Sequence, residues 1–303
     1  MRRLSVLVAG AVVALIGVNV VTGVRMEPVR AQTPAVEIQR VQDAAASPLV
    51  ASKEPIFILA LGSDARPHEP VNRLHSDAIQ LIGINPAKGG AGILGFPRDS
   101  WVTLPGRGQT RINDAMVYGG PQLAVETVES ITGIKIDYYA LTSFPEFQRM
   151  VKGIGGVTIE IEYPMHDDAS GTSFDPGRRR LGGADALAFA RDRKSAPGGD
   201  LGRSDNQGRL LIAALKKLRK DVERNPATLL RWLRTGVENV ETDLKLGEIF
   251  DLLAGATQID PSKVRNAVVP ATDGEVNGAS VVFISDGAQA LYDDLADDGM
   301  LAR

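Results

Sequence analysis

The sequence predicts an α/β fold in which helices cover both faces of a mixed sheet. Of the 303 residues, 44% are hydrophobic and 23% are charged, values that are typical of a folded domain and exclude wholesale disorder. Three apolar runs of strand length follow one another at Ile56–Gly62, Ala78–Ile84 and Gly92–Phe96. After residue 113, segments with helical periodicity alternate with short strand-like segments, which is the order expected of an α/β protein.

The first three strands are expected to form an antiparallel meander. The link from the first strand to the second, residues 63–76, has no helical pattern, whereas a parallel crossover usually contains a helix. The link from the second strand to the third, Asn85 to Gly90, is rich in turn residues and resembles a hairpin loop. In such a meander, the end of the first strand, the start of the second and the end of the third share one edge of the sheet.

Apolar residues at helical spacing indicate the later helices, and short apolar runs indicate the later strands. A helix over Asn113–Gly133 is interrupted at Gly119-Gly120-Pro121, and a helix over Phe144–Ile154 is closed by Gly155-Gly156. Further helices are expected at Ala184–Ala190, Leu201–Val222, Leu244–Leu253 and Ala288–Leu295, and further strands at Tyr138–Leu141, Val157–Ile161, Val264–Val269 and Val281–Ile284.

The N-terminus predicts export of the domain that follows it. An uncharged run from Leu4 to Val24 is long enough to cross a bilayer as one helix. The two arginines before it place residues 1–3 in the cytoplasm, so that residues 4–24 form a single-pass transmembrane anchor in the cell membrane. The alternative is a signal peptide that is cleaved near Val29-Arg30-Ala31.

Residues 25–54 lack strong periodicity and are expected to form a linker, in part helical around residues 36–46. The folded domain is then expected to occupy residues 55–303 and to lie on the extracytoplasmic side of the membrane. The chain has no cysteine, which excludes disulfides, cysteine-ligated metals and a thiol nucleophile. Its net charge of −3 argues against nucleic acid as a partner.

Charged residues lie at the three strand ends that the meander brings to one edge. Asp64 follows the first strand, Asp77 begins the second, and Arg98 and Asp99 follow the third. Ligand sites often lie just beyond strand ends, so three carboxylates and an arginine at one edge predict a binding site. The alternative is that each aspartate is only a favourable turn residue.

A second cluster is basic. Between Arg178 and Lys220 there are 12 basic and four acidic residues, in a chain that is acidic overall. Arg191 and Arg193 face the same side if the chain is extended there. Asp200, Arg203 and Gln207 lie on one stripe of the long helix, near its N-terminus, a position that suits an anion such as phosphate. Surface salt bridges of little energetic weight are the alternative.

These motifs, in this order, closely resemble the LytR-CpsA-Psr family. The resemblance runs from the first strand to the long helix and adds two further motifs, Arg111-Ile112-Asn113-Asp114-Ala115 and Tyr118-Gly119-Gly120. It implies a three-layer α/β sandwich that holds a polyprenyl-phosphate lipid, behind one N-terminal transmembrane helix. It also implies a phosphotransferase that moves a glycopolymer from a polyprenyl-pyrophosphate donor to a sugar hydroxyl of peptidoglycan, with release of polyprenyl phosphate.

The resemblance also implies roles for individual residues. Asp64 and Asp77 match the aspartates that bind Mg²⁺. The residues that match the pyrophosphate-binding set are Arg98, Arg191, Arg193, Arg203 and Gln207. Asp200 matches an acidic residue of the same motif, and Asp99 and Asp200 are the candidates for the general base. Where many members carry an arginine two positions before the second aspartate, this chain has His75.

Two other functions use the same residues. A non-catalytic sensor or scaffold would bind the polyprenyl-linked glycan without reacting with it, although the retained Asp64, Asp77 and Arg98 argue against this. A polyprenyl-pyrophosphate hydrolase would use water in place of the sugar hydroxyl. Neither the polymer that is transferred (teichoic acid, capsule or arabinogalactan) nor the choice between transfer and hydrolysis follows from the sequence.

Overall fold

The structure is a computed structural model that describes residues 36–40, 54–241 and 246–302. The expected cytoplasmic stub, the transmembrane anchor and most of the linker lie outside the described residues. Within the described ranges, every helix is too short or too polar to cross a bilayer.

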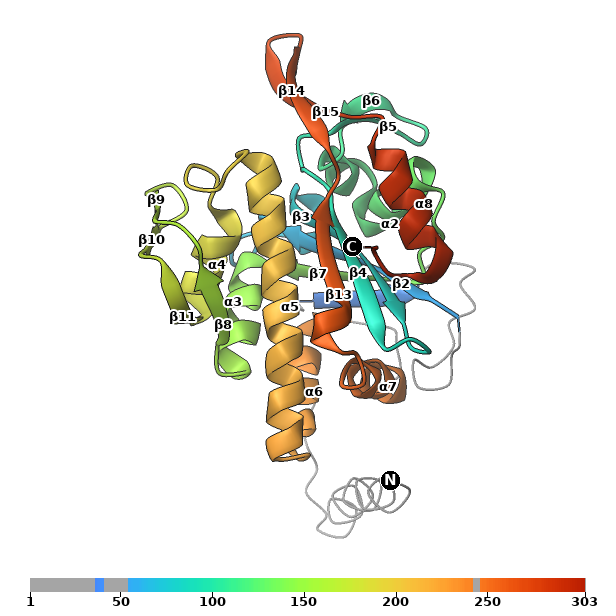
Figure 1. Cartoon of the computed structure of the whole chain (residues 1–303). Coiled ribbons are helices and arrows are strands. Elements are labelled where there is room, and N and C mark those ends of the chain that lie inside the picture. The colour runs from blue at the N-terminus through green and yellow to red at the C-terminus, as the bar shows by residue number, and fades with distance from the viewer. Residues whose placement is uncertain (1–35, 41–53, 242–245, 303) are drawn as a thin grey trace.

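A seven-stranded mixed sheet forms the centre of the fold (Figure 1). Its strands, in spatial order, are β12 (Val240–Glu241), β1 (Val36–Arg40), β7 (Tyr138–Ser143), β2 (Ile56–Ser63), β3 (Ser76–Asn85), β4 (Gly90–Gly95) and β13 (Val264–Val268). The expected meander is confirmed, because β3 pairs antiparallel with both β2 and β4. Strand β7 is parallel to β2, and β13 is parallel to β4, so the ends of β2, β4, β7 and β13 share one edge with the start of β3.

Helices cover both faces of this sheet, as predicted (Figure 1). On one face, α2 (Asp114–Thr132) and α8 (Ala288–Asp298) pack on side chains such as Leu59 and Leu81 to form the main core. On the other face lies the long helix α5 (Asp200–Arg224), with its apolar residues against β4 and β13. Four shorter helices accompany α5, namely α3 (Phe144–Gly153), α4 (Gly183–Arg191), α6 (Thr228–Val237) and α7 (Leu246–Ala256).

Four two-stranded antiparallel sheets are attached to this core. They pair β5 (Trp101–Leu104) with β6 (Gly108–Arg111), β8 (Val157–Ile161) with β11 (Gly177–Leu181), β9 (Met165–Asp167) with β10 (Thr172–Phe174), and β14 (Ala271–Val276) with β15 (Ala279–Ile284). Two short 3₁₀ turns complete the fold, η1 (Val71–Arg73) and η2 (Pro261–Lys263). Most of these strands, and α6, were not expected from the sequence. The short polar strands carry little periodic signal. Helix α6 is amphipathic, and the helical spacing of Leu229, Leu230, Trp232 and Leu233 is a signal that could have revealed it.

One expectation about the linker is wrong. Residues 36–40, for which partial helix was expected, form strand β1 of the central sheet. Antiparallel pairing with β7 and parallel pairing with β12 supply the backbone hydrogen-bond partners that a helix would supply internally. The pairing depends on strands that lie far away in the sequence, so local pattern did not reveal it. The predicted interruption of α2 is confirmed, since Gly120 has φ of 67° within the helix.

The close approach of the chain end to β3 makes Gly83 a sensitive position. A Cβ added at Gly83 would lie 2.6 Å from the carbonyl oxygen of Gly299, which follows α8. We expect Gly83→Ala to lower the free energy of unfolding by about 1–3 kcal/mol, because backbone must move to admit the methyl group. Chemical denaturation measures this loss. Gly247→Ala, with no atom within 4 Å of the added Cβ, is the matched control and should not destabilise the protein.

Candidate functional site

The edge shared by the strand ends carries a cluster of charged side chains, as the meander predicted. Asp64 lies just after β2 and Asp77 is the second residue of β3, and the amide of Asp64 donates to the carbonyl of His75 at 3.1 Å. Arg98, three residues beyond β4, donates from Nη1 to the Asp77 carboxylate. Arg98 Nε lies 3.7 Å from Asp99 Oδ1. The structure therefore places all three carboxylates and the arginine together.

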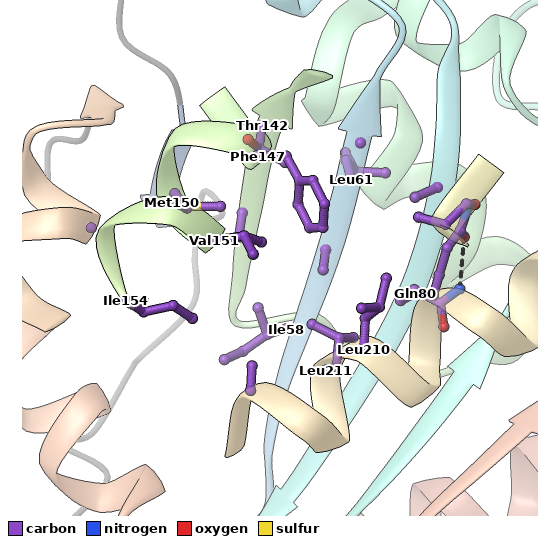
Figure 2. Close-up of a pocket in the computed structure, with 18 of the residues that line it drawn as sticks. Ile58, Leu61, Gln80, Thr142, Phe147, Met150, Val151, Ile154, Leu210 and Leu211 are labelled. Atoms are coloured by element: carbon purple, nitrogen blue, oxygen red, sulfur yellow. Dashed lines mark hydrogen bonds between the residues drawn. The ribbon is translucent and has the colours of Figure 1, made fainter. Parts of the chain in front are cut away.

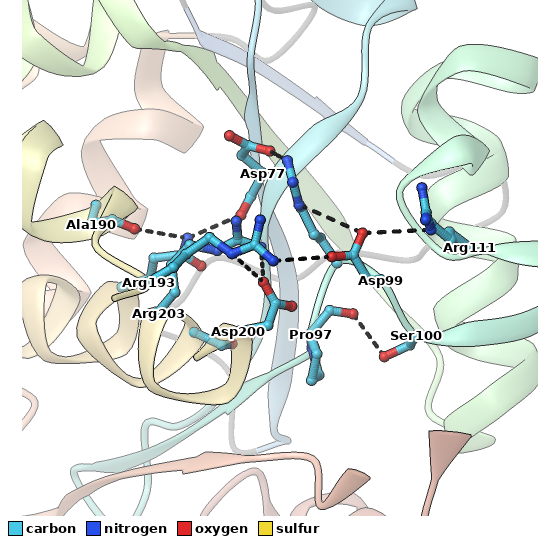
Figure 3. Close-up of polar contacts among 12 residues, drawn as sticks. Asp77, Pro97, Asp99, Ser100, Arg111, Ala190, Arg193, Asp200 and Arg203 are labelled. Carbon is cyan, nitrogen blue, oxygen red and sulfur yellow. Dashed lines mark hydrogen bonds and ion pairs between the residues drawn. The ribbon is translucent and has the colours of Figure 1, made fainter. Parts of the chain in front are cut away.

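Asp99 stands at the centre of a set of arginines (Figure 3). Besides Arg98, Arg193 Nη2 lies 3.7 Å from Asp99 Oδ2, and Arg111 Nε lies 3.7 Å from Asp99 Oδ1. Arg193 comes from the loop after α4, and Arg111 ends β6. Separations of this length are ion pairs without tight hydrogen bonds, so these guanidinium groups keep most of their donors for another anion.

The first turn of α5 contributes a buried ion pair. Arg203 Nη2 forms an ion pair with the carboxylate of Asp200, one turn earlier, and Arg193 Nε lies 3.9 Å from the same oxygen. Arg203 is only 3% exposed. Burial raises the pKa of the Asp200 carboxyl and lowers the pKa of the Arg203 guanidinium, because the protein interior disfavours both charges. Each charge is therefore retained through its partner.

Gln207 binds protein groups with its whole amide. Its Nε2 donates to the carbonyls of Asp77 at 3.0 Å and Ala190 at 3.3 Å. Two carbonyl acceptors on that side fix the amide orientation, so Oε1 must accept, and it does so from Gln80 Nε2 at 3.1 Å. Gln207 thus links α5 to β3 and to the end of α4 by hydrogen bonds, and these are the elements that carry the charged residues.

An apolar cavity of about 530 Å³ lies on the α5 side of the sheet, and Figure 2 shows part of its lining. It lies between the sheet and α3, α5, α6 and α7. Its walls are almost wholly aliphatic and aromatic, with Ile58, Phe147, Met150, Leu210 and Leu211 among the lining side chains. The polar residues that line it include Asp77, Gln80, Arg191 and Gln207, so the apolar space and the charged cluster meet.

Arg191 belongs to the cavity and is separate from the Asp99 cluster. It is the last residue of α4, and its guanidinium carbon lies 4.7 Å from the centroid of the Phe144 ring. The expectation that Arg191 and Arg193 share one side is met only in part, because Arg193 faces Asp99 and Asp200 while Arg191 lies over Phe144 beside the cavity.

Asp64 is a partly buried carboxylate beside Asp77, at the start of the cluster. Its Oδ1 is buried without a hydrogen-bond partner among the described residues. Burial, and then the neighbouring Asp77 charge, raise the pKa of the Asp64 carboxyl. Two close carboxylates with an unused buried oxygen fit a divalent cation, which would relieve both effects. Within the described chain, no group of three or more acidic or histidine side chains converges to hold a metal by itself.

His75, the residue that departs from the family pattern, is bound on the far side of this acid pair. Its Nε2 lies 3.2 Å from Oδ1 of Asp114, at the start of α2. The imidazole is 47% exposed and is not among the residues that line the cavity.

Two residues of the site were missed by the sequence reasoning. The sequence motif gives Arg111 no role, and only the folded hairpin shows that it reaches Asp99. Gln80 is one amide in an otherwise apolar strand, which is itself a signal because a buried amide needs hydrogen-bond partners.

Curated relatives carry names that describe a transfer reaction. The polyisoprenyl-teichoic acid–peptidoglycan teichoic acid transferase TagU of Bacillus mycoides is 31% identical over 205 residues, which cover 67% of this chain and 65% of the relative. TagU of Oceanobacillus iheyensis is 33% identical over 218 residues, covering 70% and 61% respectively. The chain therefore spans less than two thirds of the length of either relative.

Solved structures share the fold. Bacillus subtilis TagV superposes with a TM-score of 0.70 at 26% identity, covering 83% of this chain and all of that one. A structure described as TagT bound to LI-WTA superposes with a TM-score of 0.66 at 27% identity, covering 81% and 91%. The model of the LytR_cpsA_psr family matches residues 22–293, and this chain is a member of that family.

Proposed function

We propose that the protein transfers a glycopolymer from a polyprenyl-pyrophosphate carrier to a sugar hydroxyl of peptidoglycan, forming a phosphodiester and releasing polyprenyl phosphate. The observation that carries the proposal is the junction of an apolar cavity with a cluster of arginines and aspartates. A molecule with a long hydrocarbon chain and a pyrophosphate is matched by both parts. The names of the TagU relatives and the TagT complex support this reading.

The cavity would take the prenyl chain, and the arginines would take the pyrophosphate. Arg191 lines the cavity at its polar end, so it would meet the phosphate that is attached to the lipid. Arg98 and Arg193 would bind the second phosphate from the Asp99 side. Arg203, which is almost fully buried and paired with Asp200, would add positive potential from behind the cluster.

Asp64 and Asp77 would hold Mg²⁺, with the remaining ligands from pyrophosphate oxygens and water. The fit rests on the unpartnered Oδ1 of Asp64 and on the like charges of the pair. Bound there, the cation would neutralise charge on the phosphates and on the departing polyprenyl phosphate.

The transfer is a displacement at phosphorus. The acceptor hydroxyl oxygen bonds to the sugar-linked phosphorus, the bond from that phosphorus to the bridging oxygen breaks, and polyprenyl phosphate leaves with the bonding electrons. The hydroxyl proton passes to a base, for which we propose Asp99. The ion pairs of Asp99 are long and its side chain is 17% exposed, whereas Asp200 is 8% exposed and forms a close ion pair with Arg203.

We further propose that residues 4–24 anchor the protein in the cell membrane, with the catalytic domain outside the cytoplasm. The support is the uncharged run preceded by two arginines. An anchor would keep the domain beside a donor that is itself confined to the membrane.

The defining experiment supplies the full-length protein with a polyprenyl-pyrophosphate-linked oligosaccharide, Mg²⁺ and peptidoglycan, and identifies products by mass spectrometry. A phosphodiester-linked oligosaccharide on peptidoglycan is the expected product. Free oligosaccharide phosphate as the sole product would instead identify a hydrolase, and an unchanged donor would identify a binding protein.

We expect Asp64→Ala and Asp77→Ala each to abolish Mg²⁺-dependent transfer while leaving the protein folded. The buried Oδ1 of Asp64 has no hydrogen-bond partner that the substitution would remove. Removing either carboxylate also removes the electrostatic repulsion between Asp64 and Asp77. Initial transfer rates over a Mg²⁺ titration, with circular dichroism as the folding check, measure both effects. Asp168→Ala, which removes an exposed carboxylate, is the control. Full transfer by either site variant in a chelator would disprove the metal assignment.

The raised pKa of Asp64 predicts a pH dependence of stability without metal. The folded state binds the Asp64 proton more tightly than the unfolded state does. Ionisation of Asp64 therefore lowers the free energy of unfolding as the pH rises from about 4, the pKa of a free aspartate, through the higher pKa of the folded state. In chelator, Asp64→Asn should therefore melt higher than the wild type at pH 7, and the difference should vanish below about pH 4. Melting temperatures from pH 3.5 to 8 test this, with Asp168→Asn as control. A variant that melts lower at pH 7 contradicts it.

We expect Arg191→Ala to weaken the binding of a short polyprenyl pyrophosphate by about 1.5–3 kcal/mol, the range for a hydrogen bond to a charged group. Arg191→Lys should restore only part of the affinity, because an ammonium cannot make bidentate contacts. Isothermal titration measures both. Arg224→Ala, at the exposed end of α5, is the matched control. Equal losses in Arg191→Ala and Arg224→Ala would mean that diffuse charge, and no specific contact, binds the lipid.

A further inference from the structure

The arrangement of the sheet separates the approach of the two substrates, if the proposed transfer is accepted. The cavity lies on the α5 face of the sheet, where Ile58 and Ala60 line it. The charged cluster lies at the sheet edge, and the β5–β6 hairpin packs on the opposite side with α2, through Val102 and Leu104. Displacement at phosphorus places the attacking and leaving oxygens in line. With the leaving lipid in the cavity, the acceptor must therefore come from the side of α2, β5–β6 and β15.

That side carries the exposed aromatic side chains of the described residues. Tyr118 in α2 is 48% exposed and Phe283 in β15 is 39% exposed. The other large apolar side chains that are exposed, Val237 and Leu246, are aliphatic and lie on α6 and α7, at the opposite end of the molecule (Figure 1). Single exposed apolar residues are ordinary, but both exposed aromatics beside one charged cluster are a distinct feature.

Phe283 is held beside the cluster by hydrogen bonds. The amide of its neighbour Val282 donates to the carbonyl of Asp99 at 3.0 Å, and Arg111 Nη2 donates to the carbonyl of Ser280 at 2.7 Å. The β14–β15 hairpin thus projects from the site edge (Figure 1). Across the hairpin, Gly274 leaves room for the Phe283 ring, since any Cβ there would collide with it. The Phe283 ring therefore packs on Gly274 and is still 39% exposed to solvent.

Tyr118 lies on the same side, in α2. It lies one helical turn beyond Asp114, whose carboxylate contacts His75 next to the acid pair. The guanidinium carbon of Arg107, from the turn between β5 and β6, lies 5.7 Å from the centroid of the Tyr118 ring. The β5–β6 hairpin thus contacts β15 through Arg111, at the end of β6, and contacts Tyr118 through Arg107, at its turn.

We propose that Tyr118 and Phe283 bind the acceptor, a peptidoglycan glycan strand, and direct its hydroxyl to the cluster. A pyranose ring presents a face of C–H groups that packs on an aromatic ring, while its edge carries hydroxyl and amide groups. Arg107 and Arg111 would donate to these groups and to carboxylates of the strand. The inference rests on the proposed transfer for the identity of the strand, but the surface can be tested by binding alone.

The test measures the dissociation constant of full-length protein for a soluble, uncrosslinked peptidoglycan glycan strand, by tryptophan fluorescence or titration calorimetry. Tyr118→Ala and Phe283→Ala should each raise this constant about 3- to 10-fold, the value of one aromatic contact, and the double variant should raise it further. Affinity for a short polyprenyl pyrophosphate, measured in parallel, should change less than twofold, because neither ring lines the cavity.

Val237→Ala and Leu246→Ala are the matched controls, since they remove exposed apolar side chains elsewhere. The inference is overturned if Tyr118→Ala and Phe283→Ala leave strand binding unchanged, or if the control variants weaken it equally. It is also overturned if the wild type binds the strand no better than the double variant does. Strand binding that needs both rings in a protein that transfers nothing would uphold this surface while refuting the proposed function. Preference of the rings for lipid vesicles over the strand would overturn it in favour of a membrane contact.

Discussion

The direction of three consecutive strands is the constraint on which the site depends. Because β3 runs antiparallel to β2 and β4, residues that are far apart in the chain meet at one edge, and Arg98 bonds the Asp77 carboxylate there. Like charges at such density repel, and burial adds a desolvation cost. The cluster is tolerated because the signs alternate, with Asp99 between Arg98, Arg111 and Arg193. The long ion pairs leave donors that an anionic ligand can use.

Buried amides join this edge to the rest of the fold. Gln207 connects α5 to the backbone of Asp77 in β3 and of Ala190 in α4, and Gln80 completes the arrangement from the floor of the sheet. Both amides also line the apolar cavity. Hydrogen bonds of these two amides therefore connect the elements that carry the arginines with the elements that form the cavity wall. A ligand that fills the cavity would reach groups whose positions are already set, which reduces the ordering cost of binding.

The sheet also divides the molecule by chemistry. Its α5 face contains an aliphatic cavity suited to hydrocarbon, and its α2 face is a well-packed core that continues under the β5–β6 hairpin. The exposed rings of Tyr118 and Phe283 lie beyond that core, with Arg107 beside Tyr118 and with β15 bonded to the backbone of Asp99. In the proposed transfer, lipid and sugar need opposite surroundings, and an edge between two faces would let the reacting phosphate contact both.

The sequence alone determined the meander, the alternation of helices and strands, and the meeting of Asp64, Asp77, Arg98 and Asp99. These follow from local periodicity and from the short connections that strand direction demands. Only the tertiary structure showed that residues 36–40 form a strand, that Arg111 reaches Asp99, and that the Gln207 amide donates to backbone carbonyls. Each of these depends on partners far along the chain. The physical reason is that pairing and hydrogen-bond satisfaction are properties of neighbours in space, and local sequence records only neighbours in the chain.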